Sequence, residues 1–158
     1  MNIPADAVPA GFIEFPFPST EHFLSLTGPL YVKRDGQKLV LGLRVESRHC
    51  NIAGICHGGM LMTFADMQLS IGAKFESEDR FGFSPTLSMT TDFLSPAVNG
   101  AWIEGRTDLL RSTRNFLFCQ CIVSANGAPV LRASGIMKLG GGAFADVKGL
   151  PDLRSILK

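Results

Sequence analysis

The sequence has few charged residues and no concentration of either sign. Of its 158 residues 18% are charged, the formal net charge is +1, and the basic side chains are scattered. A general nucleic-acid binder needs a basic stripe that displaces counterions from phosphates. We therefore expect no nucleic-acid partner.

Long apolar runs are also missing. No stretch approaches the ~20 residues of a bilayer-spanning helix, so we expect no membrane span. Residues 1–20 have no basic start and contain several prolines, which argues against a secretory signal. These features predict a cytoplasmic protein.

Cysteine and histidine are scarce. The cysteines are Cys50, Cys56, Cys119 and Cys121, and the histidines are His22, His49 and His57. No CxxC pair occurs and the histidines complete no zinc pattern, so we expect no metal. Buried free thiols in a reducing compartment are the favoured interpretation. Phosphate-binding glycine loops of the Walker and dinucleotide types are absent too, and we expect no cofactor.

Apolar side chains, in contrast, are plentiful at 46% of the residues. That content and a length of 158 residues suit one domain with a real core, which we expect to span residues 1–158. Within it, the Pro- and Phe-rich residues 1–18 are expected to lie extended across the surface, and residues 143–158 form a weakly defined tail. The apolar excess also hints at a homo-oligomer.

Turn and capping signals divide the first half of the chain. Ser19 or Thr20 can cap a short helix through Leu26, and strands over 30–34 and 38–47 are joined at Asp35-Gly36. An irregular loop follows. Residues 58–75 are then apolar nearly all round, which predicts a buried central helix.

The second half of the chain predicts only strands. They cover 86–93, 101–111, 115–124 and 130–139, with Asn126-Gly127 as a hairpin turn. One long central helix wrapped by a single antiparallel sheet gives an α+β fold class.

The segment from Asn51 to His57-Gly58-Gly59 carries the first chemical signal. Two glycines at a helix start let a ligand approach the backbone closely. The first helical N–H groups are unpaired and lie at the positive end of the helix dipole. This arrangement predicts a site for an oxygen that develops negative charge, as in acyl transfer.

Asp66 carries the second signal, because it stands among Phe64, Ala65 and Met67 in a helix with almost no other charge. A buried carboxylate is costly unless it is paired, so Asp66 is either paired with a distant Arg, placed at a solvent edge, or functional. Gly58 and Asp66 are eight residues apart, ~12 Å along a helix. If both act on one carbonyl, the two groups come from two subunits across a twofold interface.

This pattern resembles the hotdog-fold thioesterases, and in particular the subgroup of the phenylacetic-acid-pathway thioesterases and thioesterase superfamily member 2. The resemblance rests on Asn51, His57-Gly58-Gly59 and Asp66 and covers about residues 25 to 142. It implies a hotdog fold, hydrolysis of an acyl- or aryl-acetyl-CoA, and a homodimer with shared active sites. Dimer and dimer of dimers are both open.

The resemblance also implies roles for single residues. The Gly58 N–H polarises the thioester carbonyl beside Gly59, while Asp66 of the opposite subunit acts as general base or nucleophile. Asn51 and His57 position the carbonyl or the leaving thiolate. Two further roles are implied. Thr86 orients water, and Arg111 and Arg114 contact the CoA phosphates.

Simpler interpretations stay open for several of these residues. His57 could merely satisfy backbone groups at a helix end, Asn51 could bond its own loop, and Thr86 could be an ordinary strand residue. Arg111 and Arg114 could belong to a solvated turn. Two other functions are also open, namely a dehydratase or hydratase of acyl thioesters and a non-catalytic acyl-CoA-binding protein. The acyl group itself is not determined.

Overall fold

The computed structural model of the chain describes residues 7–17, 19, 21–77, 83–139 and 152–158. Its strands are β1 (Ile13–Glu14), β2 (Tyr31–Asp35), β3 (Lys38–Arg44), β4 (Thr86–Phe93), β5 (Trp102–Ser112), β6 (Phe116–Ala125) and β7 (Ala128–Lys138). Its helices are α1 (Phe23–Thr27), the 3-10 turn η1 (Ser47–His49), α2 (Gly58–Ser77) and α3 (Leu153–Ile156).

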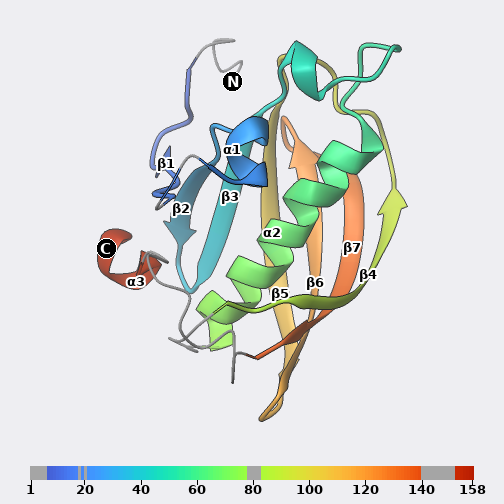
Figure 1. Cartoon of the computed structure of the whole chain (residues 1–158). Coiled ribbons are helices and arrows are strands. Elements are labelled where there is room, and N and C mark those ends of the chain that lie inside the picture. The colour runs from blue at the N-terminus through green and yellow to red at the C-terminus, as the bar shows by residue number, and fades with distance from the viewer. Residues whose placement is uncertain (1–6, 18, 20, 78–82, 140–151) are drawn as a thin grey trace.

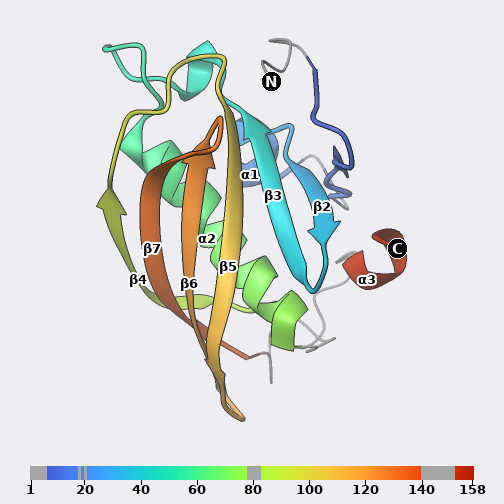
Figure 2. The same ribbon diagram turned by 180° about the vertical axis from the view of Figure 1, so that it is seen from behind.

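All the described strands join one sheet, in the order β1-β2-β3-β5-β6-β7-β4, and every neighbouring pair is antiparallel. Helix α2 lies across one face of this sheet, and the other face carries no helix of that length (Figures 1 and 2). The predicted α+β class, with one central helix against an antiparallel sheet, is confirmed.

Two predicted hairpin turns are present where the sequence placed them. Asn126 and Gly127 join β6 to β7 with φ values of 49° and 89°. Consecutive positive φ angles are what a two-residue turn of type I′ requires. Gly36, with φ 61°, turns β2 into β3. The local sequence alone therefore specified these two strand registers.

Helix α2 is held on the sheet by apolar packing and by one polar side chain. Gln68 is fully buried, and its Nε2 donates to Leu39 O at 3.0 Å and to Thr107 Oγ1 at 2.9 Å. Its Oε1 accepts from Leu41 N–H at 2.9 Å. A Cβ on Gly105 would lie 2.6 Å from Gln68 Cγ, so glycine at that position leaves the space for this amide.

The prediction that α2 is buried all round is wrong on one side. Gly59 and Met62 are exposed, and Thr63, Asp66 and Ser70 are only partly buried. These positions recur every three or four residues and form one stripe along the helix. We call this set the α2 stripe; it faces away from the sheet because the apolar residues on the other side already fill the core.

The N-terminal expectations also need correction. Residues 13–14 form β1 at the sheet edge, and Phe12 and Phe15 are buried rather than spread over the surface. Phe12 packs edge-on against the Trp102 ring at 5.1 Å, because an aromatic pair buries large apolar area.

Helix α1 begins later than the predicted caps. It starts at Phe23 with His22 before it and no side-chain cap, since Ser19 accepts from Glu21 N–H instead. Thr20 lies outside the described residues.

The C-terminal tail has one ordered part among the described residues. Helix α3 follows Asp152, and Leu157 behind it is buried. Arg154 lies over the Phe75 ring, 4.6 Å from its centre, and donates to Phe75 O. The weakly defined tail was thus a wrong expectation for 152–158, whereas 143–151 lie outside the described residues. In the described part of the chain, no helix has the length and apolarity to span a membrane.

Candidate active site

His57 closes the N-terminus of α2. Its carbonyl accepts from Leu61 N–H at 3.1 Å, and its Nδ1 accepts from Gly59 N–H at 2.9 Å. The backbone N–H of His57 in turn donates to His49 O at 2.8 Å. Because Nδ1 accepts, a neutral imidazole here carries its proton on Nε2. The interpretation that His57 satisfies backbone groups at a helix end is therefore right, and the ring keeps one outward donor.

Gly58 is the first residue of α2. The N–H at this position has no partner inside a helix, so it is the donor that the helix end presents. A Cβ on Gly58 would lie 3.2 Å from the Phe93 ring, and one on Gly59 would lie 3.0 Å from His57 Nδ1. A Cβ at either position would therefore be crowded by a neighbouring ring, which explains why glycine fits there. Phe93, which was not predicted as a site residue, lies beside Gly58.

Asn51 lies in the loop before the helix. Its Oδ1 accepts from Ala53 N–H at 2.9 Å, and its backbone N–H donates to Ile55 O at 2.9 Å. The local loop interpretation therefore holds for the side-chain oxygen. The amide NH₂ is the part of Asn51 that can donate to a ligand.

Asp66 is partly buried on the α2 stripe and contacts the first residue of β4. Thr86 Oγ1 donates to Asp66 Oδ1 at 2.5 Å. The sequence named both residues, and the fold brings them together across 20 positions. Of the three interpretations of Asp66, pairing with an Arg is wrong, because the bonded partner is a hydroxyl at a solvent edge.

Gly58 and Asp66 both lie on α2, so the ~12 Å separation along one helix applies to them. Arg111 and Arg114 lie elsewhere. Arg111 is near the end of β5 and Arg114 is in the turn to β6, which lies at the opposite end of the sheet from the start of α2 (Figures 1 and 2). Both are exposed. Within one chain they do not meet Gly58.

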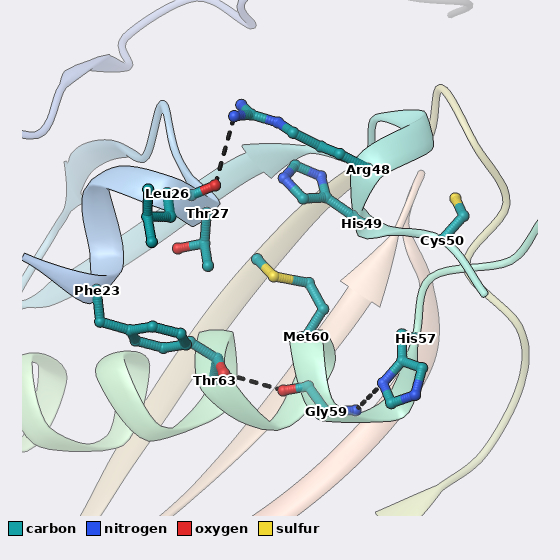
Figure 3. Close-up of a pocket in the computed structure, with 10 residues that line it drawn as sticks. All are labelled: Phe23, Leu26, Thr27, Arg48, His49, Cys50, His57, Gly59, Met60 and Thr63. Carbon is teal, nitrogen blue, oxygen red and sulfur yellow. Dashed lines mark hydrogen bonds between the residues drawn. The ribbon is translucent and has the colours of Figure 1, made fainter.

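A pocket of about 530 Å³ lies between α1, η1 and the first turns of α2. His57 and Gly59 line it at one end, and Phe23, Leu26 and Met60 supply apolar walls (Figure 3). The position of this pocket is not predictable from the sequence, because the segments that line it are far apart along the chain.

His49 also lines this pocket. It is only 4% exposed, and its Nε2 has no hydrogen-bond partner in the described part of the chain. The sequence places this histidine in no zinc pattern and outside the His57-Gly58-Gly59 motif, so it was expected neither as a metal ligand nor as a second catalytic histidine. Among the described residues, no cluster of three or more His, Cys, Asp or Glu side chains is arranged to hold a metal ion.

The four cysteines are free thiols, and three of them are buried. Burial raises the pKa of Cys56 to about 11 and the pKa values of Cys119 and Cys121 to about 12. The thiolate is the reactive form, so these three thiols are poor nucleophiles near neutral pH. The expectation of buried free thiols is confirmed for them, and Cys50 is partly exposed.

Comparison with known proteins gives a consistent result. Residues 53–130 match the family model of the thioesterase superfamily. A Pseudomonas aeruginosa protein that carries an esterase name is 32% identical over 133 residues, which cover 84% of this chain and 97% of that protein.

Solved structures share the fold. The Escherichia coli PaaI protein of the phenylacetic acid degradation operon aligns with a TM-score of 0.66 at 17% identity, over 77% of this chain and 87% of that one. A hypothetical thioesterase of Streptococcus pneumoniae, solved with coenzyme A, aligns with a TM-score of 0.61 at 18% identity, over 71% of this chain and 86% of that one. The hotdog fold implied by the sequence motif is therefore confirmed.

Proposed function

Since the chain belongs to the thioesterase superfamily and is a thioester hydrolase, we propose that it hydrolyses acyl-CoA to a free acid and CoA at a site shared between two subunits. The observation that carries the proposal is the placement of two complementary groups on one helix. The Gly58 N–H is presented at the start of α2, and the Thr86-bonded carboxylate of Asp66 lies farther along the same helix. CoA as the leaving group is supported by the structural relative solved with it.

The Gly58 N–H is suited to the thioester carbonyl oxygen. An N–H at the positive end of a 20-residue helix stabilises the negative charge that this oxygen gains when the carbon becomes tetrahedral. The Gly59 N–H cannot share this task, because it donates to His57 Nδ1. His57 Nε2–H and the Asn51 amide are the neighbouring donors for the carbonyl or the leaving sulfur.

Asp66 is suited to activate water. Thr86 donates to Oδ1, which fixes the carboxylate plane and leaves Oδ2 to take a proton from water. The hydroxide oxygen bonds to the thioester carbon, and the oxyanion rests on the Gly58 N–H. Collapse breaks the C–S bond, and the thiolate receives the proton from Asp66. In the alternative route, Asp66 attacks the carbon itself and water then hydrolyses the acyl anhydride.

The helix geometry supports a site that includes a second copy of the chain, if Gly58 and Asp66 act on one carbonyl. Groups that act on one carbonyl lie within ~3 Å of the reacting atoms, whereas Gly58 and Asp66 of one α2 are ~12 Å apart along the helix. Two α2 helices packed antiparallel through their α2 stripes bring Gly58 of one subunit to Asp66 of the other. Strand β4 supports this assembly, because it is a sheet edge that exposes Leu87 and Phe93.

Arg111 and Arg114 fit the same assembly as phosphate contacts from the partner subunit. Both are exposed, and neither forms an ion pair within the described part of the chain. The scheme uses no metal and no cofactor besides the CoA thioester itself. The free thiols of Cys56, Cys119 and Cys121 suit a reducing compartment, and we place the reaction in the cytoplasm.

The test is a panel of acyl-CoAs assayed for release of free thiol, with enoyl hydration followed in parallel. We expect thiol release at a rate that requires Asp66. Hydration of an enoyl-CoA without thiol release would identify a hydratase instead. After a single turnover in ¹⁸O-water, label on the Asp66 carboxylate would identify an anhydride route in which water attacks the Asp66 carbon. Label on the product acid alone is the result expected both for the general-base route and for an anhydride that water attacks at the acyl carbon.

A further inference from the structure

Cys50 and Cys56 lie opposite each other at the base of the loop that precedes α2. They form an isolated antiparallel bridge. Two backbone hydrogen bonds flank the pair, from His57 N–H to His49 O at 2.8 Å and from Asn51 N–H to Ile55 O at 2.9 Å. Because these bonds join the residues on either side of the cysteines, Cys50 and Cys56 are a non-hydrogen-bonded pair.

This register brings the two side chains close together. Partners in a non-hydrogen-bonded antiparallel pair have Cα atoms ~4.5 Å apart and side chains on the same side. A disulfide forms between cysteines whose Cα atoms are about 4.4–6.8 Å apart. Cys56 is part of the core and Cys50 packs against it. The pair therefore lies within reach of a disulfide without a change of fold.

Neither sulfur is held in place by a strong bond. Cys50 Sγ contacts Glu46 O at 3.4 Å, and Cys56 Sγ contacts His57 O at 3.9 Å. A thiol is a weak hydrogen-bond donor, so rotation of either side chain loses little.

The two thiols differ in access and in reactivity. Cys50 is partly exposed and lines the pocket beside the start of α2 (Figure 3). Cys56 is only 4% exposed, and its burial, together with the neighbouring charge of Cys50, raises the pKa of its thiol to about 11. Since the thiolate is the reactive form, we expect Cys50 to react first with a small oxidant and Cys56 to react second.

Cys119 and Cys121 provide an internal contrast. They are two residues apart on β6, ~6.6 Å along the strand, which is near the upper limit for a disulfide. Both are buried. We therefore expect them to stay reduced under conditions that oxidise the first pair.

We propose that Cys50 and Cys56 are a modification site, at which hydrogen peroxide converts the two thiols into a reversible disulfide. The Cys50 thiolate attacks the peroxide, the O–O bond breaks, hydroxide leaves and is protonated to water, and the sulfur becomes a sulfenic acid. The Cys56 thiolate then attacks that sulfur, so that the S–S bond forms, the S–O bond breaks and a second water leaves. The two sulfur atoms together lose two electrons, which reduce the peroxide to water.

The disulfide would act on the neighbouring site. A relaxed disulfide has Cα atoms ~5.5–6 Å apart, about 1 Å more than the pair has in this register. The bond would widen the base of the loop that carries Asn51 and leads into His57-Gly58. A misplacement of ~1 Å can cost an enzyme up to about 100-fold in rate, so we expect oxidation to slow hydrolysis. This effect rests on the proposed thioesterase function, whereas the bond itself does not.

Mass spectrometry tests the bond in the unaltered protein. The folded protein is treated with hydrogen peroxide, its remaining thiols are blocked with N-ethylmaleimide in denaturant, and it is digested with trypsin. Both cysteines of the pair lie in residues 49–74, and Cys119 and Cys121 lie together in residues 115–132, because no Lys or Arg interrupts either range.

We expect the first peptide to lose two hydrogen atoms and to escape the label, and the second to carry the label on both thiols. A first peptide that is labelled on both cysteines, carries added oxygen or is linked to a second copy of the chain would overturn the proposal.

Kinetics test the effect on the site. Hydrolysis is followed by the loss of thioester absorbance, because a disulfide reagent would itself oxidise Cys50. We expect kcat/KM of the oxidised protein to fall about tenfold, the effect of one misplaced hydrogen-bond donor, and to recover under a thiol reductant. An unchanged rate in protein that contains the bond would overturn the effect on activity. No hydrolysis by the reduced protein would overturn the thioesterase function, whereas the mass measurement still decides the bond.

The variant Cys50→Ser links the two measurements. It removes the thiol that reacts first, so we expect neither the bond nor any loss of its own reduced-state rate under peroxide. Cys121→Ala is the matched control and should keep both the bond and the sensitivity to peroxide. Equal loss of activity in Cys50→Ser and in the unaltered protein would show that peroxide acts elsewhere.

Discussion

The hydroxyl of Thr86, the first residue of β4, lies 2.5 Å from the Asp66 carboxylate in the middle of α2. Thr86 belongs to β4, which is an edge strand of the sheet, and Asp66 belongs to the α2 stripe. The hydrogen bond orients the only carboxylate of the α2 stripe, and it links the helix that presents Gly58 to the strand edge proposed to face a second copy.

Replacing Asp66 by Asn removes the base and keeps the size of the side chain. We expect kcat to fall at least ~100-fold with little change in KM, as for a positioned acid–base group. Thiol release under saturating substrate measures the effect, and circular dichroism checks the fold. A near-normal kcat would exclude Asp66 from the mechanism.

Replacing Thr86 by Val keeps the shape and removes the hydroxyl. Because the carboxylate loses one fixed donor, we expect kcat to fall about tenfold, the value of a single hydrogen bond. Thr86→Ser restores the hydroxyl and should recover most of the rate. If Val and Ser variants share one kcat, the hydroxyl has no part in orienting Asp66.

Mixing two inactive variants tests whether the active site is shared. Gly58→Pro removes the N–H at the first helical position, and Asp66→Asn removes the base. Gly58→Ala is the control for the first variant, because it adds the same Cβ beside the Phe93 ring but keeps the N–H. Exchange of subunits should restore part of the activity, because one site of each mixed dimer keeps both groups. Mixed dimers that form and stay inactive would contradict a shared site.

Replacing Gln68 by Leu tests the buried amide that holds α2 on the sheet. The substitution leaves Leu41 N–H and Leu39 O without their side-chain partners, so we expect about 2–4 kcal/mol less free energy of unfolding. Urea denaturation measures it. Gln120→Leu, at an exposed position of β6, is the matched control and should change stability by less than ~0.5 kcal/mol. Equal losses would show that the amide has no special role.

Replacing Arg111 and Arg114 together by Ala tests the phosphate contacts. We expect KM for acyl-CoA to rise while kcat stays close to its original value, because these contacts lie far from the reacting carbonyl. The loss should shrink at high salt and with an acyl-pantetheine that lacks the nucleotide phosphates. Equal losses on both substrates would mean that the arginines support the fold instead.

Local sequence determined much of this architecture. Strand β4 has the bounds predicted from the sequence, and Asn126-Gly127 forms the expected turn because these residues accept positive φ. The start of α2 was also predictable, since His57-Gly58-Gly59 carries its own capping chemistry. These features depend on interactions within a few residues of the chain.

Other features were decided only by contacts between distant segments. Phe12 and Phe15 were predicted to lie on the surface, but both are buried, and Phe12 packs against the ring of Trp102. The buried Nε2 of His49 depends on η1, α1 and α2 meeting around one pocket. No local sequence pattern predicts that these three elements pack around one pocket.

The sequence by itself determined that one helix carries both Gly58 and Asp66 and how far apart they lie along it, because spacing along a helix is fixed by its rise per residue. Only the tertiary structure decided that Thr86 bonds Asp66, that the α2 stripe stays exposed, and that a pocket opens beside His57. The physical reason is that burial and side-chain pairing between distant segments arise when the whole chain packs, whereas helix geometry is local.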